Sequence, residues 1–358
     1  MSPAIVHVAS GREWRGGQRQ VWLLACELGR RGVEQVVVTG GESELARRLM
    51  ASGVRVRPAA WRAGLDPRVI RPILHELHGR SVVLHAHDGH ALTLAGTCAG
   101  LTGTPIVATR RVTFPLQRRF FWRRACRIIA ISQAVRDALL RDGLEAARLV
   151  IIPSAVDPQA CGAKGVDIRT RLGLPRNGQV ALNLGALTPE KDQSTLIGAA
   201  ARLVRDLPDL RWVIVGEGPL EKKLRQQIVQ LGLEGRVHLL GHLDDPHLAL
   251  GQADVFVLSS ISEGLGSSAL AAMACDVPIV ATRVGGVPDL LGSGGGVLVE
   301  PGQPAELAAA VHRVLTDSSL RWRLTNTARG ELGRFSVSAM AEQVLSVYRS
   351  CAHSLGGS

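Results

Sequence analysis

The sequence lacks the patterns that would place it at once in a membrane or at a redox site. No run of about 18 apolar residues could cross a bilayer, and no basic stretch precedes an apolar signal core near residue 1. The cysteines at 26, 98, 126, 161, 275 and 351 include no CxxC-type pair. We therefore expect a cytoplasmic protein whose cysteines are reduced and mostly buried.

Lysine is also scarce, because only four of the 42 basic residues are lysines. The net charge is +11, and residues 1–165 hold 24 basic against 12 acidic residues, which leaves 18 against 19 for residues 166–358. This asymmetry favours an anionic partner for the first half, either a phosphorylated substrate, a membrane surface or nucleic acid. A solvated arginine surface explains it equally well. No recognised nucleic-acid-binding module accompanies the charge, so we expect no nucleic-acid partner.

The length of 358 residues, with 46% hydrophobic and 20% charged residues, indicates two folded domains. Short β-branched runs alternate with helical stretches in both halves, which is typical of α/β domains with doubly wound parallel sheets. Helices are expected to start near Gly17 and Gln133. The expected strands are residues 4–9, 35–39, 82–85, 105–109 and 127–131, then 180–184, 211–215, 237–240, 255–258 and 278–281.

Proline and glycine interrupt this pattern between residues 153 and 164, before a new helical stretch at residues 166–172. Apolar residues at 337, 340, 344 and 347 recur at helical spacing and precede a polar tail, residues 354–358. We expect a first domain of residues 1–160, a second of residues 161–334, and a helix within residues 335–358 that returns to the first domain.

In open parallel sheets, ligands bind beyond the carboxyl ends of the strands, so the turns there are candidate sites. Gly16-Gly17 follows the first strand and precedes a helix, where glycine allows close backbone approach and the helix N-terminus favours an anion. The alternative is a turn without a ligand. The turn lacks the GxGxxG spacing of a dinucleotide fingerprint, which disfavours a nicotinamide-dependent oxidoreductase.

Lys191 stands at the entrance of a helix, after a turn that begins at Gly185. A lysine beside a helix N-terminus is unfavourable unless an anion lies between them, so Lys191 is a candidate phosphate ligand; a solvated surface lysine is the alternative. The turn that begins at Gly216 is interpreted as mainly structural. Asp244-Asp245 is interpreted as a turn or helix cap, and no metal site is expected.

In this order, the motifs along the chain resemble the retaining glycosyltransferases of the GT-B fold, specifically family 4. The resemblance covers nearly the whole chain. The motifs are Gly16-Gly17, His85-Ala86-His87-Asp88, residues 129–135, residues 150–157, Gly185 to Lys191, residues 213–219, residues 237–241, Glu263-Gly264 and residues 278–282. The resemblance implies two Rossmann-like domains that face a cleft, with the acceptor bound by the first domain and a nucleotide-sugar donor by the second.

The resemblance also implies residue roles. Lys191 would neutralise the leaving diphosphate, Glu263 would bind sugar hydroxyls, and Gly16 and Gly17 would approach the diphosphate or the acceptor. Members of the family usually need no metal ion or other cofactor. The implied catalytic residues are Lys191, Glu263, His87 and Arg111; the implied donor-binding residues are Gly16, Gly17, Gly185, Lys191, Gly216, Gly241, Glu263, Gly264, Leu265, Gly266, Ser267 and Ser268.

Three positions depart from the pattern of the relatives. Ala186 stands where many relatives have an arginine that binds the diphosphate. Arg111 stands where many have a histidine, and an arginine can bind phosphate or carboxylate but cannot act as a base at neutral pH. Ala271 replaces a second glutamate that binds the ribose, a loss that costs about 1.5–3 kcal/mol. We expect weak donor binding, or a ribose that is held differently.

Arginine and aromatic residues alternate densely within residues 114–124 of the first half. This pattern suits an anionic glycolipid or a membrane surface, and it is equally typical of a partly buried helix with a solvated arginine face. The expected acceptor-binding residues are Arg110, Arg111, Arg118 and Arg119.

The function expected from these observations is retaining transfer of a sugar from a nucleotide-diphosphate sugar to an anionic cell-envelope glycolipid or polysaccharide, such as a lipopolysaccharide core. The enzyme would work in the cytoplasm, in peripheral contact with the inner face of the membrane. The alternative is a catalytically degenerate GT-B protein that binds sugar or lipid without turnover, which the losses at Ala186 and Ala271 favour.

Overall fold

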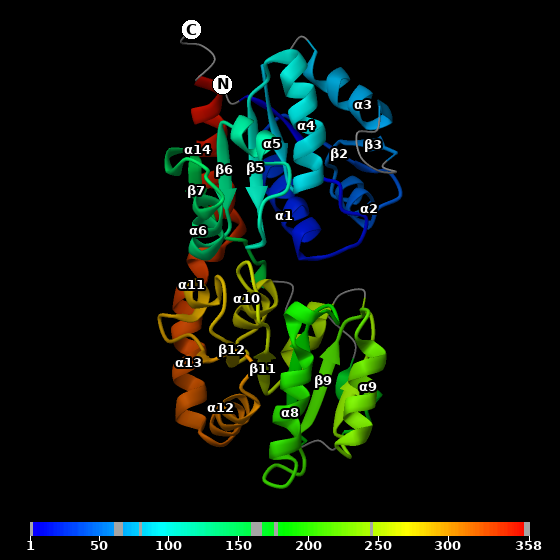
Figure 1. Ribbon diagram of the computed structural model, residues 1–358, viewed down its shortest axis with the longest axis vertical. Helices are drawn as coiled ribbons and strands as arrows, with labels where there is room; N and C mark the ends of the chain where they lie inside the picture. The colour runs from blue at the N-terminus through cyan, green and yellow to red at the C-terminus, as the bar shows by residue number, and fades with distance from the viewer. Residues whose placement is uncertain are drawn as a thin grey trace. The chain divides into compact units, whose positions relative to one another are not determined.

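The computed structural model describes residues 3–60, 67–78, 81–158, 167–174, 178–243 and 246–353. The chain forms two compact units (Figure 1): Met1–Ala155 with Arg334–Ser358, here unit 1, and Val156–Gly333, here unit 2. These junctions differ from those expected by five residues and by one residue. The polar tail at 354–358, Cys161, and Asp244-Asp245 lie outside the described residues.

Unit 1 is built on a parallel sheet with the strand order β3-β2-β1-β4-β5-β6-β7. The β-branched runs form its central strands because a parallel sheet covered on both faces buries every side chain of such a run. Val36, Val37 and Val38, for example, are at most 3% exposed. The strands are β1 (Ala4–Val8), β2 (Gln35–Gly40), β3 (Val56–Ala59), β4 (Val82–Ala86), β5 (Ile106–Arg110), β6 (Arg127–Ala130) and β7 (Leu149–Ile151).

Two groups of helices cover this sheet. One group, α1, α2 and α14, packs against the core of β1, β2, β4 and β5, and the other consists of α3, α4 and α5. Side chains of Ser43, Asp88 and Ser132 cap three of the helices at the N-terminus. The helices are α1 (Gly16–Arg30), α2 (Glu44–Ala51), α3 (Pro67–Leu77), α4 (Gly89–Thr102), α5 (Arg119–Arg124), α6 (Gln133–Arg141), η1 (Ala146–Arg148) and α14 (Val337–His353).

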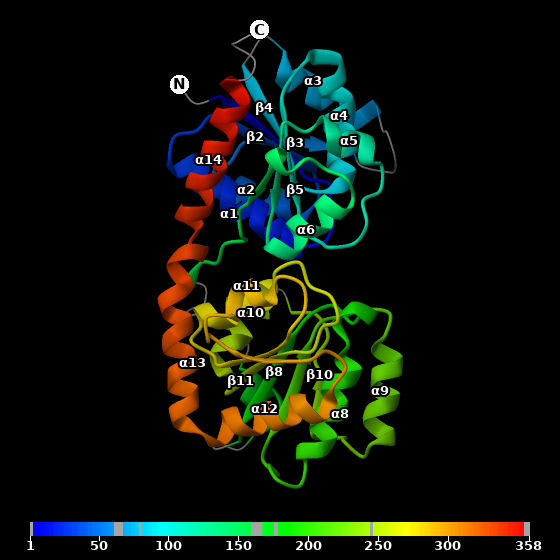
Figure 2. The ribbon, with the colours of Figure 1, turned by 60° about the vertical axis from the view of Figure 1, so that its left-hand side comes forward.

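The C-terminal helix α14 lies against α1, β4 and β5 of unit 1 (Figure 2). Val344, Leu345 and Tyr348 of this helix are buried beside Leu24 and Leu28 of α1. The Arg31 guanidinium after α1 forms an ion pair with Glu342, with 2.6 Å between Nη1 and Oε2. An apolar stripe therefore returns the end of the chain to the first unit.

A disulfide joins Cys126, just before β6, to Cys351 in the last turn of α14, with 6.2 Å between the Cα atoms. Cys275 is disulfide-bonded as well. The expectation that the cysteines are reduced is therefore wrong for these three residues. Sequence spacing could not reveal the first bond because its cysteines are 225 residues apart and become neighbours only when α14 packs on unit 1. Cys26 and Cys98 are free thiols.

Unit 2 has a second parallel sheet with the order β10-β9-β8-β11-β12-β13. Alternate residues such as Val255 and Val257 face the main core of this unit, which α8, α9, α12 and α13 complete. The strands are β8 (Val180–Leu184), β9 (Arg211–Val215), β10 (Val237–Leu239), β11 (Val255–Leu258), β12 (Ile279–Thr282) and β13 (Val297–Val299). The helices are α7 (Ile168–Arg171), η3 (Pro189–Lys191), α8 (Gln193–Leu203), α9 (Glu221–Gln230), η4 (Pro246–Gln252), α10 (Ser267–Ala274), α11 (Val287–Leu291), α12 (Pro304–Thr316), α13 (Ser318–Glu331) and η5 (Leu332–Phe335).

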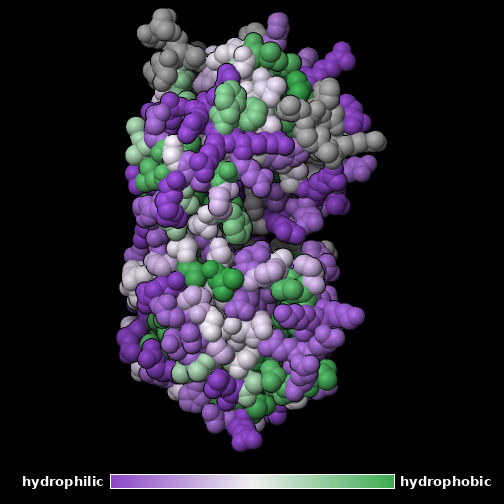
Figure 3. Space-filling view, in the orientation of Figure 1, coloured by the Kyte–Doolittle hydropathy of each residue, from purple (hydrophilic) through white to green (hydrophobic). Residues whose placement is uncertain are grey.

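The two doubly wound parallel sheets confirm the expected α/β architecture. On the face drawn in Figure 3, hydrophilic residues predominate and apolar residues gather in small groups. Among the described residues, none of the helices combines the length and the apolar character needed to cross a bilayer.

Candidate functional site

The strand order of unit 2 reverses between β8 and β11, which are neighbours in the sheet although β9 and β10 lie between them in the chain. Such a switch point opens a crevice beyond the carboxyl ends of the strands, where ligands bind. The ladder pairs Val255 with Ala181 and Phe256 with Leu182. Next along β8, the side chain of Asn183 donates a hydrogen bond from Nδ2 to the Val257 carbonyl at 2.8 Å. This amide links the two strands at the switch point, a role that the sequence analysis missed.

Lys191 and Glu263 meet at this switch point, one after β8 and the other after β11. Lys191 Nζ donates a hydrogen bond to Glu263 Oε1 at 2.6 Å, and Ser260 Oγ donates to the same oxygen at 2.8 Å. The Glu263 side chain is 8% exposed and that of Lys191 is 24% exposed. The sequence made Lys191 a candidate phosphate ligand, and in this structure its ammonium group is paired with the Glu263 carboxylate.

The loop after Glu263 leads directly into α10, whose N-terminus is open to an anion. Gly266 stands at the cap position with a φ of 89°, no side chain caps the helix, and its first turn carries no acidic residue. Free N–H groups at a helix N-terminus favour phosphate or carboxylate. Gly264, Leu265, Ser267 and Ser268 lie in this same loop and first turn.

Gly285, in the loop after β12, packs directly on the backbone of Glu263. A Cβ at Gly285 would lie 1.8 Å from the Glu263 carbonyl oxygen, and the φ of +52° also favours glycine. Thr282 Oγ1 donates a hydrogen bond to the Ser260 carbonyl at 2.6 Å. The β12 loop therefore fixes the β11 loop, and with it the position of the Glu263 carboxylate.

The predicted donor glycines Gly185, Gly216 and Gly241 lie together at the ends of β8, β9 and β10. Gly216 N donates a hydrogen bond to the Gly241 carbonyl at 2.9 Å. A Cβ at Gly216 would lie 2.0 Å from the Gly185 carbonyl oxygen, and its φ is +144°. Packing between the loops therefore explains why Gly216 is glycine.

In unit 1 the strand order reverses between β1 and β4. Gly16 and Gly17 open α1 at this switch point. Arg111, which follows β5, lies beside them, since its Cδ is 3.7 Å from the position of a Cβ on Gly17. Its Nε is buried without a hydrogen-bond partner. Burial lowers the pKa of Arg111 to about 10, although the Asp88 carboxylate raises it, so the guanidinium is charged at neutral pH.

His87 lies inside unit 1 and is only 4% exposed. Its Nε2 is 2.9 Å from Nδ1 of His7. His85 is also buried, with Nδ1 2.6 Å from the Tyr348 hydroxyl and Nε2 2.8 Å from Thr109 Oγ1. Burial is the main cause that lowers the pKa of both His85 and His87 well below the usual value, so both rings are neutral.

The other predicted acceptor arginines have partners within unit 1. Arg110 donates hydrogen bonds to the carbonyls of residues 112 and 114, and its guanidinium lies 5.5 Å from the Trp122 ring centroid. Arg119 pairs with Asp142 at 3.1 Å, and Arg118 Nη1 donates to Thr93 Oγ1 at 3.4 Å. In the same segment Trp122 is buried, whereas Phe114 and Phe120 are 52% and 62% exposed.

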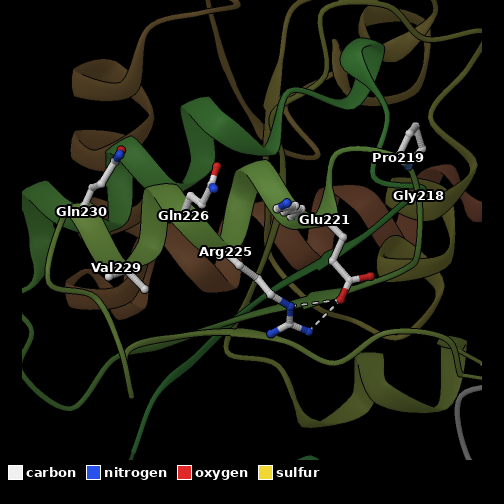
Figure 4. A pocket seen from close by; sticks show the side chains of 8 residues that line it. Gly218, Pro219, Glu221, Arg225, Gln226, Val229 and Gln230 are labelled. Atoms are coloured by element: carbon white, nitrogen blue, oxygen red, sulfur yellow. Dashed lines mark hydrogen bonds and ion pairs between the residues drawn. The ribbon is translucent and has the colours of Figure 1, made fainter.

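A shallow hollow of about 820 Å³ lies along α9, and neither Lys191 nor Glu263 is among its lining residues (Figure 4). Arg225 spans part of it and forms an ion pair with Glu221 at 2.7 Å. Of its lining residues, Gly218 and Pro219 belong to the loop after β9, and the others lie on α9. The hollow therefore shares only its edge with the predicted donor loops.

Residues 14–160 match the family described as Glycosyltransferase Family 4, and residues 167–331 match Glycosyl transferases group 1. The 2-deoxystreptamine N-acetyl-D-glucosaminyltransferase of Streptomyces fradiae is 30% identical over 388 aligned residues, which cover 93% of this chain and 90% of the relative. The chain belongs to glycosyltransferase family 4. The resemblance expected from the motifs is thereby confirmed.

Other relatives are similar over shorter segments. The lipopolysaccharide core biosynthesis glycosyltransferase LpsE of Rhizobium meliloti is 33% identical over 184 residues, which cover 51% of this chain and 53% of LpsE. The alignment with the 2-deoxystreptamine glucosyltransferase of Streptomyces kanamyceticus spans 58% of that protein. Against these two curated relatives, the chain spans little more than half of their length.

The crystal structure of HepE from Anabaena in complex with UDP and glucose has a TM-score of 0.85 to this chain, at 22% identity. The match covers 97% of this chain and 100% of HepE. At this identity the likeness concerns the fold alone, and it confirms the GT-B architecture of two Rossmann-like units.

Proposed function

We propose that this protein is a retaining glycosyltransferase that takes its sugar from a nucleotide-diphosphate sugar and needs no metal ion for the transfer. The observation that carries this proposal is the Lys191–Glu263 pair at the switch point of unit 2, 2.6 Å apart and next to the uncapped N-terminus of α10. Membership of family 4 and the glycosyltransferase names of the relatives support it. The UDP and glucose bound to HepE support a nucleotide-sugar donor.

Each part of this site has a role that suits its chemistry. Lys191 and the N–H groups of Leu265, Gly266 and Ser267 supply positive charge and hydrogen-bond donors to the diphosphate, and stabilise the negative charge that develops as it leaves. The Glu263 carboxylate accepts hydrogen bonds from hydroxyls of the donor sugar. Because Lys191 and Glu263 already hold each other in place, little reorganisation is needed when the donor binds.

Unit 1 is proposed to hold the acceptor, with Arg111 beside Gly17 as its anion-binding group. A charged guanidinium whose Nε lacks a protein partner suits a phosphate or a carboxylate. The charge of the first half and the similarity to LpsE support a cell-envelope glycolipid or polysaccharide precursor as the acceptor.

The exposed Phe114 and Phe120 are proposed to contact the membrane surface that carries this acceptor. Phe120 lies beside Arg124, whose guanidinium is 5.4 Å from the ring centroid, so apolar and cationic groups are presented together. The proposed location is the cytoplasm, in peripheral contact with the inner face of the membrane, and these exposed groups support the membrane contact.

The test is release of nucleoside diphosphate from a panel of nucleotide sugars, with lipid-linked and soluble acceptors. Turnover that Lys191→Ala abolishes and Lys222→Ala leaves intact is the expected result. Lys222 is the matched control because it lies on α9, lines the hollow there and is not part of the Lys191–Glu263 pair.

A degenerate GT-B protein that binds sugar or lipid without turnover is the second candidate, and Ala271 is the observation that favours it. This residue is 2% exposed within α10, and alanine cannot supply the acid that relatives direct to the ribose. Measurable binding of a nucleotide sugar in a thermal-shift assay, without turnover with any acceptor, would select this second function.

A further inference from the structure

Three histidines form a buried cluster at the carboxyl edge of the unit 1 sheet. His7 of β1 lies directly opposite His85 of β4 in the parallel ladder, and His87 is two residues further along the same side of the chain. All three are at most 4% exposed. One ring nitrogen from each lies within 4.8 Å of the other two.

The spacing within this cluster is close to that of a metal site. A tetrahedral zinc ion with bonds of about 2.0–2.1 Å holds its nitrogen ligands roughly 3.3 Å apart. His7 Nδ1 and His87 Nε2 are already 2.9 Å apart, so small ring rotations would open the required space. The rings of His85 and His87 are in contact, with centroids 3.9 Å apart, which places the third ligand beside the other two.

Groups that could orient two of the three rings are also present. A histidine that binds a metal usually donates its other N–H to an oxygen. Thr109 Oγ1 is 2.8 Å from His85 Nε2. Beside His7, Gln35 has a buried Oε1 without a hydrogen-bond partner, and His7 Nε2 also lacks one. These two atoms would satisfy each other if His7 bound a metal through Nδ1.

We propose that His7, His85 and His87 bind one divalent transition-metal ion, with zinc as the expected metal. Three imidazoles suit zinc and its neighbours in the periodic table rather than magnesium or calcium. The Tyr348 hydroxyl, 2.6 Å from His85 Nδ1, is an oxygen positioned to complete the ligand set. Because Tyr348 belongs to α14, the ion would fasten the C-terminal helix to the sheet. The three histidines belong to unit 1 and the Lys191–Glu263 pair to unit 2, and the role proposed for the ion is structural.

A positive group close to the cluster predicts that the affinity is moderate. The Arg111 guanidinium acts electrostatically on both His85 and His87, and it would repel a divalent cation. Replacement of this charge by the apolar side chain in Arg111→Met should therefore tighten metal binding about tenfold, the equivalent of about 1.4 kcal/mol.

The experiment uses the full chain without a histidine tag, stripped with a chelator and then titrated with Co²⁺ and Zn²⁺. We expect one bound ion per chain, the intense visible absorption of four-coordinate Co²⁺, and displacement of Co²⁺ by Zn²⁺. His7→Ala and His87→Ala should lose the ion. His75→Ala should keep it, because His75 is exposed on α3 of the same unit.

Failure of wild-type protein to bind either ion would overturn the proposal and leave a neutral, hydrogen-bonded histidine cluster. Stoichiometric binding that persists in both His7→Ala and His87→Ala would overturn it too. If these variants do not fold, the Co²⁺ spectrum of the wild-type protein decides, since octahedral absorption without displacement by Zn²⁺ contradicts the site. None of these results depends on glycosyl transfer.

Discussion

Lys191 and Glu263 lie 72 residues apart in the sequence and are joined by a hydrogen bond of 2.6 Å between Nζ and Oε1. The bond links the loop after β8 to the loop after β11 at the point where the strand order reverses. Ile261 N, which donates to the Glu190 carbonyl at 2.9 Å, and Ser259 Oγ, which donates to the Lys191 carbonyl at 3.0 Å, tie the same loops together. Both charges are thereby held in place before a donor arrives.

Loss of this lysine should affect turnover much more than donor binding. Removal of one positioned charge that stabilises a developing anion typically costs about 10²–10³ in kcat. We expect a loss of this size for Lys191→Met, measured as release of nucleoside diphosphate, and none for Lys222→Met on α9. A decrease no greater than that of the control would contradict the role of Lys191 at the leaving group.

Lys191→Met should also reduce the stability of the protein. Of the two groups that donate hydrogen bonds to the buried Glu263 Oε1, Lys191 and Ser260, only Ser260 would remain. An uncompensated buried group of this kind costs about 1–3 kcal/mol, more if it is charged. Urea unfolding should show this loss for Lys191→Met and partial recovery in Lys191→Met/Glu263→Gln. Equal losses in the single and double variants would mean that the pair is not coupled.

Restoration of the missing acid tests how the nucleotide is held. Ala271 is 2% exposed, so Ala271→Glu should lower the melting temperature of the free protein by burying a carboxylate. If the ribose lies beside α10, the same variant should bind nucleoside diphosphate about tenfold more tightly, since a charge-assisted hydrogen bond contributes about 1.5–3 kcal/mol. Calorimetric titration measures the affinity, with Ala271→Gln as the uncharged control. Unchanged or weaker binding would place the ribose elsewhere.

The central strands of both sheets could be predicted from the sequence because their apolar runs are buried on both faces. The loops that carry Lys191 and Glu263 follow two of these strands, so their places could be predicted as well. The strands that escaped prediction, β3, β7 and β13, all lie at sheet edges. Each has three or four residues and is partly exposed, and β3 contains Pro58, which only an edge position tolerates. Their patterns are too short and too polar to stand out.

Contacts between distant residues could not be predicted because no local pattern encodes them. The sequence made Lys191 a candidate phosphate ligand, but only the order of the strands brings the Glu263 carboxylate to it. The histidine cluster likewise depends on the register that places His7 opposite His85. The family resemblance implies a catalytic role for His87, and in this structure its ring contacts His7 and His85.

The disulfide between Cys126 and Cys351 should contribute about 2–4 kcal/mol to the stability of unit 1 by restricting the unfolded chain. Cys351→Ser should therefore unfold at a lower urea concentration than the wild-type protein. Because this variant lacks the Cys126–Cys351 bond, a reducing agent should destabilise it less than it destabilises the wild-type protein. Cys26→Ser is the matched control because Cys26 is a free thiol of the same unit. Equal stability of the two variants under oxidising conditions would show that the bond does not form.

The Cys98 thiol makes stability depend on pH in the alkaline range. Burial raises the pKa of Cys98 to about 11, from an ordinary value of 9.0. Between these values the unfolded chain loses a proton that the folded protein retains, so the free energy of unfolding falls as the pH rises. The thiol should account for a loss of about 1–3 kcal/mol between pH 9 and 11. Burial also raises the pKa of Tyr348, which adds a loss of the same sign. The measurement is the free energy of unfolding between pH 9 and 11 for the wild-type protein and for Cys98→Ala, and the difference between the two slopes against pH is the contribution of the thiol. Equal slopes would show that Cys98 ionises as easily in the folded protein as in the unfolded chain.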